Sequence, residues 1–133
     1  MLCIKIQSMT HETPRLIYLA SPYSHPDPTV RNARYHAACV TTAALIQRGY
    51  PVFSPIVHSH VLHTEHGLGG SWETWAKIDR ALIGASSDVW VLCLDGWRES
   101  RGVKAEIEQA RAEGLGLALI DEKGDFVQDV WGV

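Results

Sequence analysis

The chain has 133 residues, of which 46% are hydrophobic and 20% charged. This composition excludes a disordered or multidomain protein and indicates one globular domain. With 15 acidic residues against 12 basic ones and a formal charge of −3, the sequence also argues against a protein that binds a nucleic-acid polymer or an anionic membrane.

The expected compartment is the cytoplasm. Residues 1–14 lack the long apolar core of a signal peptide, and no apolar run is long enough to span a bilayer. The cysteines Cys3, Cys39 and Cys93 form no CxxC pair, so neither a zinc ribbon nor a redox site is indicated. Small buried thiols in a reducing compartment are the simpler interpretation.

The N-terminal part of the chain predicts a tail, a buried strand and a long helix. Residues 1–14 show no clear pattern and are expected to form a tail, so that a single domain spans residues 15–133. The apolar run at 16–20 is followed by Ser-Pro, which is typical of a strand buried on both faces. After a proline-rich loop, Thr29 is expected to cap a helix that ends at Gly49.

The middle of the chain predicts a short strand and two helices. The strand is expected at 50–53 and the first helix at 56–66. The glycine-rich residues 67–70 interrupt the pattern, and Ser71 is a suitable N-cap for the second helix, which should end at 84–87.

The C-terminal part begins with the clearest strand of the sequence, at 88–94, which is rich in β-branched and aromatic residues. Ser100 or Glu99 is expected to cap the helix that follows. A further strand is predicted at 115–120, and residues 126–131 form either an edge strand or a tail.

These elements alternate in the order β-α-β-α-α-β-α-β, and the strands are apolar throughout. Such alternation indicates an α/β fold, in which a small, mostly parallel sheet of four or five strands is covered by helices on both faces. Ligands of such folds bind at the carboxyl ends of the strands, near the topological switch point. Site residues are therefore expected at 21–24, 54–60 and 95–100 and in the helix starts that follow.

The string Ser100-x-Gly102-x-x-x-Glu106-x-x-x-Ala110 begins a helix that follows a strand. Free backbone N–H groups and the helix dipole at Ser100 and Gly102 suit a phosphate or another anion. Gly102, Glu106 and Ala110 are spaced one turn apart, so small residues leave room for a ligand beside a carboxylate. An exposed glutamate in a charged segment is the alternative.

Asp79 shares a helix face with Trp72 and Trp75, which precede it by seven and four residues. Two aromatic rings and a carboxylate on one face suit the stacking and hydrogen bonding of a heterocyclic base. Two core tryptophans beside a surface acid would give the same pattern.

The loops after two strands supply weaker candidates. The first strand ends in Tyr18-Leu19-Ala20-Ser21-Pro22-Tyr23, which places a hydroxyl and a phenol at the carboxyl edge of the sheet. Asp95 and Trp97 follow the clearest strand as candidate substrate contacts, with Asp95 able to bind a sugar hydroxyl or simply to shape the turn.

A group of four histidines, His58, His60, His63 and His66, follows the second strand. Histidine is the commonest transition-metal ligand, but no HExxH pattern and no nearby cysteine support a metal site. Imidazoles that face substrate or solvent are favoured, with His58 or His60 over the pocket because the segment begins at a strand's carboxyl end.

Taken together, the sequence motifs resemble the nucleoside 2-deoxyribosyltransferase superfamily. The motifs that carry the resemblance are the run YLASPYS, Asp79 on a helix, the strand SDVWVL and the string SRGVKAEIEQA. This superfamily includes the deoxynucleoside 5′-monophosphate N-glycosidases, and the resemblance is closest to a bacterial and phage branch. It covers roughly residues 15–120. It implies a flavodoxin- or Rossmann-like three-layer sandwich and a homodimer or homotetramer in which neighbouring subunits complete each other's pockets.

The resemblance also implies roles for individual residues. Glu106 matches the catalytic nucleophile, and Asp79 matches the acid that protonates or orients the base. The residues that match the pocket for the sugar and its 5′-hydroxyl or 5′-phosphate are Tyr18, Ala20, Ser21, Pro22, Ser100 and Gly102.

The expected function is therefore cleavage or transfer at the N-glycosidic bond of a (deoxy)nucleoside or nucleoside 5′-monophosphate. A carboxylate beside C1′ suits the oxocarbenium-like transition state, and a second acid assists departure of the base, so neither a metal nor a redox cofactor is required. The alternatives are a non-catalytic nucleotide-binding module or sensor, and a metal-dependent phosphohydrolase that uses the histidines.

Overall fold

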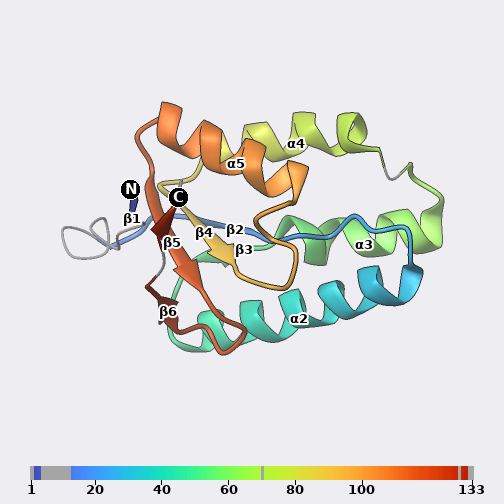
Figure 1. Cartoon of the computed structure of the whole chain (residues 1–133), viewed down its shortest axis with the longest axis horizontal. Helices are drawn as coiled ribbons and strands as arrows, with labels where there is room; N and C mark the ends of the chain where they lie inside the picture. The colour runs from blue at the N-terminus through green and yellow to red at the C-terminus, as the bar shows by residue number, and fades with distance from the viewer. Residues whose placement is uncertain (1, 4–12, 70, 129, 132–133) are drawn as a thin grey trace.

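A central sheet of the computed structural model lies between helices on both faces, with α4 and α5 on one face and α2 on the other, and α3 packs beside α2 (Figure 1). The structure describes residues 2–3, 13–69, 71–128 and 130–131. The helices are α2 (Pro28–Gln47), α3 (Pro55–His66), α4 (Trp72–Gly84) and α5 (Arg101–Ala112). The strands of the sheet are β2 (Ile17–Ala20), β3 (Val52–Phe53), β4 (Asp88–Leu92), β5 (Gly116–Ile120) and β6 (Phe126–Val127).

The sheet has the order β3-β2-β4-β5-β6. β2 pairs in parallel with β3 and β4, β4 pairs in parallel with β5, and β6 is antiparallel to β5. The chain therefore runs from β2 to one side and then returns to β4 on the other side, which makes the switch point lie between β2 and β4. The predicted three-layer α/β sandwich with a mostly parallel sheet is confirmed.

The pleat of β2 decides which side chains face which helices. Ile17 and Leu19 join a buried cluster with Leu45 of α2. Tyr18 and Ala20 point to the opposite face, where they join a cluster with Ile83 of α4 and Ile107 of α5. The phenol of Tyr18 consequently lies on the side of the sheet that α4 and α5 cover.

Several boundaries differ from those expected. α2 is capped by Asp27, not Thr29, since the Asp27 Oδ1 accepts the Thr29 N–H at 2.9 Å. Pro28 suits the first helical position because its missing N–H would have no partner there. The clearest strand ends at Leu92, two residues early. The predicted caps Ser71 of α4 and Ser100 of α5 are confirmed.

The two ends of the chain pair with each other. β1 (Leu2–Cys3) is antiparallel to β7 (Val130–Trp131), so the segment expected as a tail contains a strand. Residues 126–131 divide into the edge strand β6 and this second small sheet. Strands of two residues carry no periodicity that a sequence pattern can reveal. The remainder of the expected tail, residues 4–12, lies outside the described residues.

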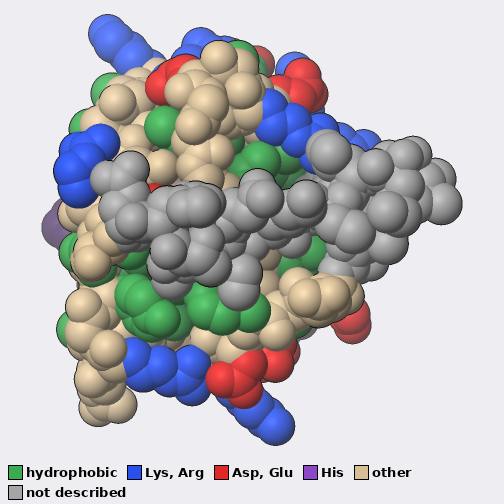
Figure 2. Space-filling model, turned by 90° about the vertical axis from the view of Figure 1, so that its left-hand side faces the viewer, with side chains coloured by type: hydrophobic (Ala, Val, Ile, Leu, Met, Phe, Trp, Pro, Cys, Tyr) green, Lys and Arg blue, Asp and Glu red, His purple; other side chains and the backbone are tan. Residues whose placement is uncertain are grey.

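Within the described ranges, none of the helices combines the length and apolar character that a membrane crossing needs. Cys39 and Cys93 are only partly buried, which differs from the expected full burial. On the face shown in Figure 2, the described Lys and Arg side chains are scattered among Asp and Glu instead of forming one patch.

Candidate functional site

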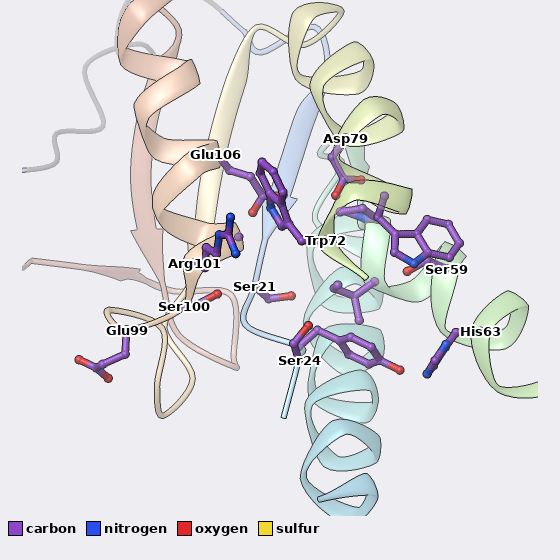
Figure 3. Close-up of a pocket in the computed structure, with 15 residues that line it drawn as sticks. Ser21, Ser24, Ser59, His63, Trp72, Asp79, Glu99, Ser100, Arg101 and Glu106 are labelled. Atoms are coloured by element: carbon purple, nitrogen blue, oxygen red, sulfur yellow. The ribbon is translucent and has the colours of Figure 1, made fainter. Parts of the chain in front are cut away.

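A pocket of about 390 Å³ lies at the carboxyl ends of β2 and β4, where the sheet topology predicts a ligand site. This volume is within the usual range for small-molecule sites, about 300–1,000 Å³. Figure 3 shows its walls, which come from the loop after β2 and from α3, α4 and α5. The lining residues are Ser21, Tyr23, Ser24, Pro55, Ile56, Ser59, His63, Trp72, Trp75, Asp79, Glu99, Ser100, Arg101, Gly102 and Glu106.

Two carboxyl groups that line this pocket, those of Glu106 and Asp79, lie near one phenol that is buried outside the lining. The buried hydroxyl of Tyr18 donates a hydrogen bond to Glu106 Oε2. The pKa of Tyr18 is raised by burial and by the charges of Glu106 and Asp79, so the phenol keeps its proton and remains a donor. Tyr18 on β2 thus contacts Glu106 of α5 and also influences the carboxyl group of Asp79 on α4.

Both carboxyl groups hold their protons more tightly than usual. Burial raises the pKa of Glu106 to about 8, the charge of Asp79 adds to that rise, and the Tyr18 hydrogen bond opposes it. Burial likewise raises the pKa of Asp79 to about 6, while Tyr18 and His58 act in the opposite direction. Perturbed carboxyl groups that face a pocket are typical of catalytic acids and nucleophiles.

The N-terminus of α5 forms an anion-compatible end of the pocket. Ser100 Oγ accepts the Val103 N–H at 3.2 Å, and the earlier N–H groups of the first turn point out of the helix start. The Arg101 guanidinium lies 5.1 Å from the centre of the Trp72 ring, which keeps a cation at this end. A Cβ at Gly102 would meet only Ser100 Oγ, at 4.0 Å, so the glycine leaves open space.

Ser21 places an unused hydroxyl in the same pocket. The residue is 6% exposed, and its Oγ has no hydrogen-bond partner among the described residues. A buried hydroxyl without a partner is uncommon in proteins. Because Ser21 also lines the pocket, its hydroxyl is positioned to bond a ligand.

The sequence matches the family described as a domain of unknown function (DUF1937) over residues 15–122. The chain belongs to the DUF1937 family. Every pocket-lining residue falls inside the DUF1937 match, as does Tyr18. Among curated proteins, none matches this chain.

Most of the expected site residues of this DUF1937 domain come together. Six of them line the pocket: Ser21, Tyr23, Asp79, Ser100, Gly102 and Glu106. Tyr18 does not line it, but its hydroxyl donates a hydrogen bond to Glu106. Pro22 is buried beside Ser21, and Ala20 is a fully buried core residue behind the pocket. Trp72 and Trp75, considered as stacking partners of a base, both line the pocket.

Three expected substrate contacts lie elsewhere. Trp97 is 8% exposed and packs in the core cluster that contains Ile83 of α4 and Ile107 of α5. The exposed Asp95 uses its backbone oxygen to accept a bond from Arg34 at 3.1 Å. His58 is exposed and outside the pocket lining, although it is near enough to lower the pKa of Asp79.

The histidines of α3 point in different directions. His60 is buried, bonds Tyr23 at 2.7 Å and stacks on Tyr35 with ring centres 3.9 Å apart. His63, not His58 or His60, lines the pocket. In the part of the chain that the structure describes, no three His, Cys, Asp or Glu side chains are grouped as a metal ion would need.

Sequence reasoning expected most of the lining segments but did not single out every residue. The lining residues not named individually are Ser24, Pro55, Ile56, Ser59, His63, Glu99 and Arg101, and of these only His63 lies outside the expected segments 21–24, 54–60 and 95–100 and the helix starts that follow. A usable signal existed on α3, because Ile56, Ser59 and His63 are spaced three and four residues apart and thus share one face.

Proposed function

We propose that this DUF1937 protein cleaves the N-glycosidic bond of a (deoxy)nucleoside or nucleoside 5′-monophosphate, or transfers the sugar from it to another base. The observation that carries the proposal is the pair of carboxyl groups, Glu106 and Asp79, which line a pocket of nucleotide size next to the buried Tyr18. Bond cleavage at C1′ calls for a carboxylate on one side and a proton donor for the departing base.

The pair is suited to hold one proton near neutral pH, between its pKa values of about 6 and about 8. These values place the single proton mainly on Glu106 and the charge mainly on Asp79. The reactive form is the other arrangement of the same pair, with the charge on Glu106 and the proton on Asp79. The hydrogen bond from Tyr18 stabilises the charged Glu106 in this arrangement.

In the first step, a Glu106 oxygen forms a bond to C1′ while the bond from C1′ to the base nitrogen breaks. Asp79 gives its proton to the departing base, which leaves as a neutral molecule. In the second step, water or a second base attacks C1′ and releases Glu106, with Asp79 taking the proton back. Water gives hydrolysis, and a second base gives transfer.

The two ends of the pocket suit the two ends of a nucleotide. The start of α5, with Ser100, Gly102 and Arg101, favours a 5′-phosphate. The aromatic rings of Trp75 and Tyr23 lie in the wall that remains for a base. Ser21 supplies a hydroxyl for the sugar or the phosphate.

The proposal includes assembly into a homodimer or homotetramer. A second cavity of about 400 Å³ between α4 and α5 shares Trp72, Asp79 and Glu106 with the pocket. A neighbouring subunit over this second cavity would limit solvent access to the carboxyl pair.

The test is release of free base from a panel of nucleosides and their 5′-monophosphates, followed by chromatography. The wild-type protein should release base from at least one member, and Glu106→Gln should lower the rate by about 100-fold or more, because an amide cannot act as the nucleophile. Glu122→Gln, at an exposed position after β5 and outside both cavities, is the matched control and should keep the wild-type rate.

Two results would contradict the proposal. A Glu106→Gln protein with the full rate would remove Glu106 from the reaction. A wild-type protein that binds panel members without releasing base would instead support a non-catalytic nucleotide-binding module.

A further inference from the structure

His63 lines the pocket, and one of its two ring nitrogens is held in a defined hydrogen bond. Its Nδ1 lies 2.8 Å from the carbonyl oxygen of Leu68, just beyond the end of α3. A carbonyl oxygen can only accept, so Nδ1 carries the hydrogen of this bond. In the neutral ring Nε2 is then the atom with a free lone pair, and it acts as an acceptor.

His63 occupies the end of the pocket that is opposite the anion-compatible start of α5. Figure 3 shows its ring across the pocket from Glu99 and Arg101, with the carboxyl groups of Asp79 and Glu106 along one wall. A ligand whose reacting carbon lies beside Glu106 and whose anionic group lies at α5 would place its remaining part near His63.

Ser59 lies one turn before His63 on the same face of α3 and also lines the pocket. Thr64 on this helix uses its hydroxyl internally, donating to the His60 carbonyl at 2.9 Å. Among the described residues, the Ser59 hydroxyl has no such partner. It can therefore rotate to donate to a ligand or accept from one.

The aromatic residues at this end have already used their polar atoms. The Trp75 indole N–H donates to the Gly69 carbonyl at 2.9 Å, and the Tyr23 hydroxyl is bonded to His60 Nδ1 at 2.7 Å. Their rings remain as apolar walls for a flat ligand. The polar recognition that α3 offers thus falls to His63 Nε2, a fixed acceptor, and to the adaptable Ser59 hydroxyl.

From this arrangement we infer that His63 and Ser59 select a base that carries an exocyclic amino group, as in adenine or cytosine. The inference rests on the proposed N-glycosidic function. The amino group donates to His63 Nε2, and the adjacent ring nitrogen accepts from Ser59. Hypoxanthine and uracil present a carbonyl oxygen in place of the amino group, so two acceptors would face each other.

The two facing acceptors determine how strongly the site should prefer an amino base over an oxo base. A site that hydrogen-bonds a substrate group rejects an analogue that leaves its polar atom unpaired. For one neutral hydrogen bond replaced by two facing acceptors, the preference for the amino base should be about 10- to 100-fold in kcat/KM.

The experiment compares the 2′-deoxynucleoside 5′-monophosphates of adenine with hypoxanthine and of cytosine with uracil, since each pair differs at the amino or oxo position. Wild type should prefer the amino member of each pair. His63→Phe keeps a flat ring without the acceptor, and its preference should fall to about twofold or less. His66→Phe, an exposed position on the same helix outside the pocket lining, should keep the wild-type ratio.

Failure of the inference and failure of the proposed function give different results. Base release with equal rates for both members, or a His63→Phe protein that keeps the preference, overturns the inference alone. If no base is released, the proposed function fails, and tryptophan-fluorescence titration with the same four nucleotides decides the inference. Tighter binding of the amino members that is lost in His63→Phe supports it, and equal or absent binding overturns it.

Discussion

Tyr18 has an unusual position next to the pocket, because its single buried hydroxyl contacts Glu106 and also affects the pKa of Asp79. Its hydrogen bond lowers the pKa of both Glu106 and Asp79, against the larger effect of burial. Tyr18 therefore has a positioning and electrostatic role, distinct from the bond-forming role proposed for Glu106. The pH dependence of the rate separates the contribution of Tyr18 to catalysis from the contributions of Glu106 and Asp79.

In the wild type, base release should follow a bell-shaped pH profile with limbs near the pKa values of about 6 and about 8. Tyr18→Phe removes a bond that lowers both pKa values, so both limbs should move to higher pH. Loss of a hydrogen bond to a charged group should also reduce kcat/KM at pH 7 by about 10- to 100-fold. The measurement is the rate of base release from pH 4 to pH 10.

Tyr50→Phe is the control for this prediction. Tyr50 packs edge-on against Trp90 in the core cluster on the other side of the sheet, so the same chemical change is made away from the carboxyl groups. Its pH profile should match that of the wild type. A Tyr18→Phe profile with unmoved limbs would show that the hydroxyl does not act on the carboxyl pair.

At the scale of single elements, α4 and α5 offer a matched pair of helix starts. Ser71 Oγ accepts the Thr74 N–H at 3.4 Å, and Ser100 Oγ accepts the Val103 N–H at 3.2 Å. The two serines thus perform the same structural task. Only Ser100 also lines the pocket, so comparison of the two isolates its effect on a ligand.

Ser71→Ala and Ser100→Ala should each lower the free energy of unfolding by about 1 kcal/mol, since each removes one N-cap. Only Ser100→Ala should weaken binding of a nucleoside 5′-monophosphate. The measurement is the thermal midpoint of each variant with and without the nucleotide, because a ligand that binds the folded state raises the midpoint. Equal ligand-induced shifts in both variants would count against a ligand contact at Ser100.

The same elements show what local sequence can and cannot predict. Ser71 and Ser100 were identifiable because a cap is a property of four consecutive residues. Thr29 was a wrong choice because Asp27 and Thr29 are both good caps, and the decisive feature is that Pro28 prefers the first helical position. The position of His63 in the pocket depended on which face of α3 turns inward, and that is set by packing against α2.

At the scale of the molecule, the site exists only because distant segments meet. Tyr18 and Glu106 are separated by 88 positions in the chain. The alternation of strands and helices predicted that β2, β4 and the start of α5 share one edge of a parallel sheet, so the neighbourhood was predictable. The contact itself depends on the pleat of β2, which turns Tyr18 toward α4 and α5 while Leu19 faces α2.

Burial of the two carboxyl groups also affects the stability of the whole fold. Unfolded carboxyl groups have pKa values of about 4, whereas folded Asp79 and Glu106 have raised pKa values of about 6 and about 8. Between pH 4 and pH 8 the folded state therefore binds more protons than the unfolded state. The contribution of these groups to stability is fully present below about pH 4 and is lost as the pH rises through the folded values.

The free energy of unfolding should consequently fall between pH 6 and pH 8, with Glu106 contributing a slope of up to about 1.4 kcal/mol per pH unit. Glu106→Gln removes that titration and should flatten the slope, so that the variant gains on the wild type as the pH rises. Glu108→Gln, an exposed site on the same helix, should retain the wild-type slope. Urea denaturation at pH 6, 7 and 8 and constant ionic strength measures the difference. Parallel curves for wild type and Glu106→Gln would mean that Glu106 is already ionised in the folded protein, because only a group that binds its proton on folding produces this slope.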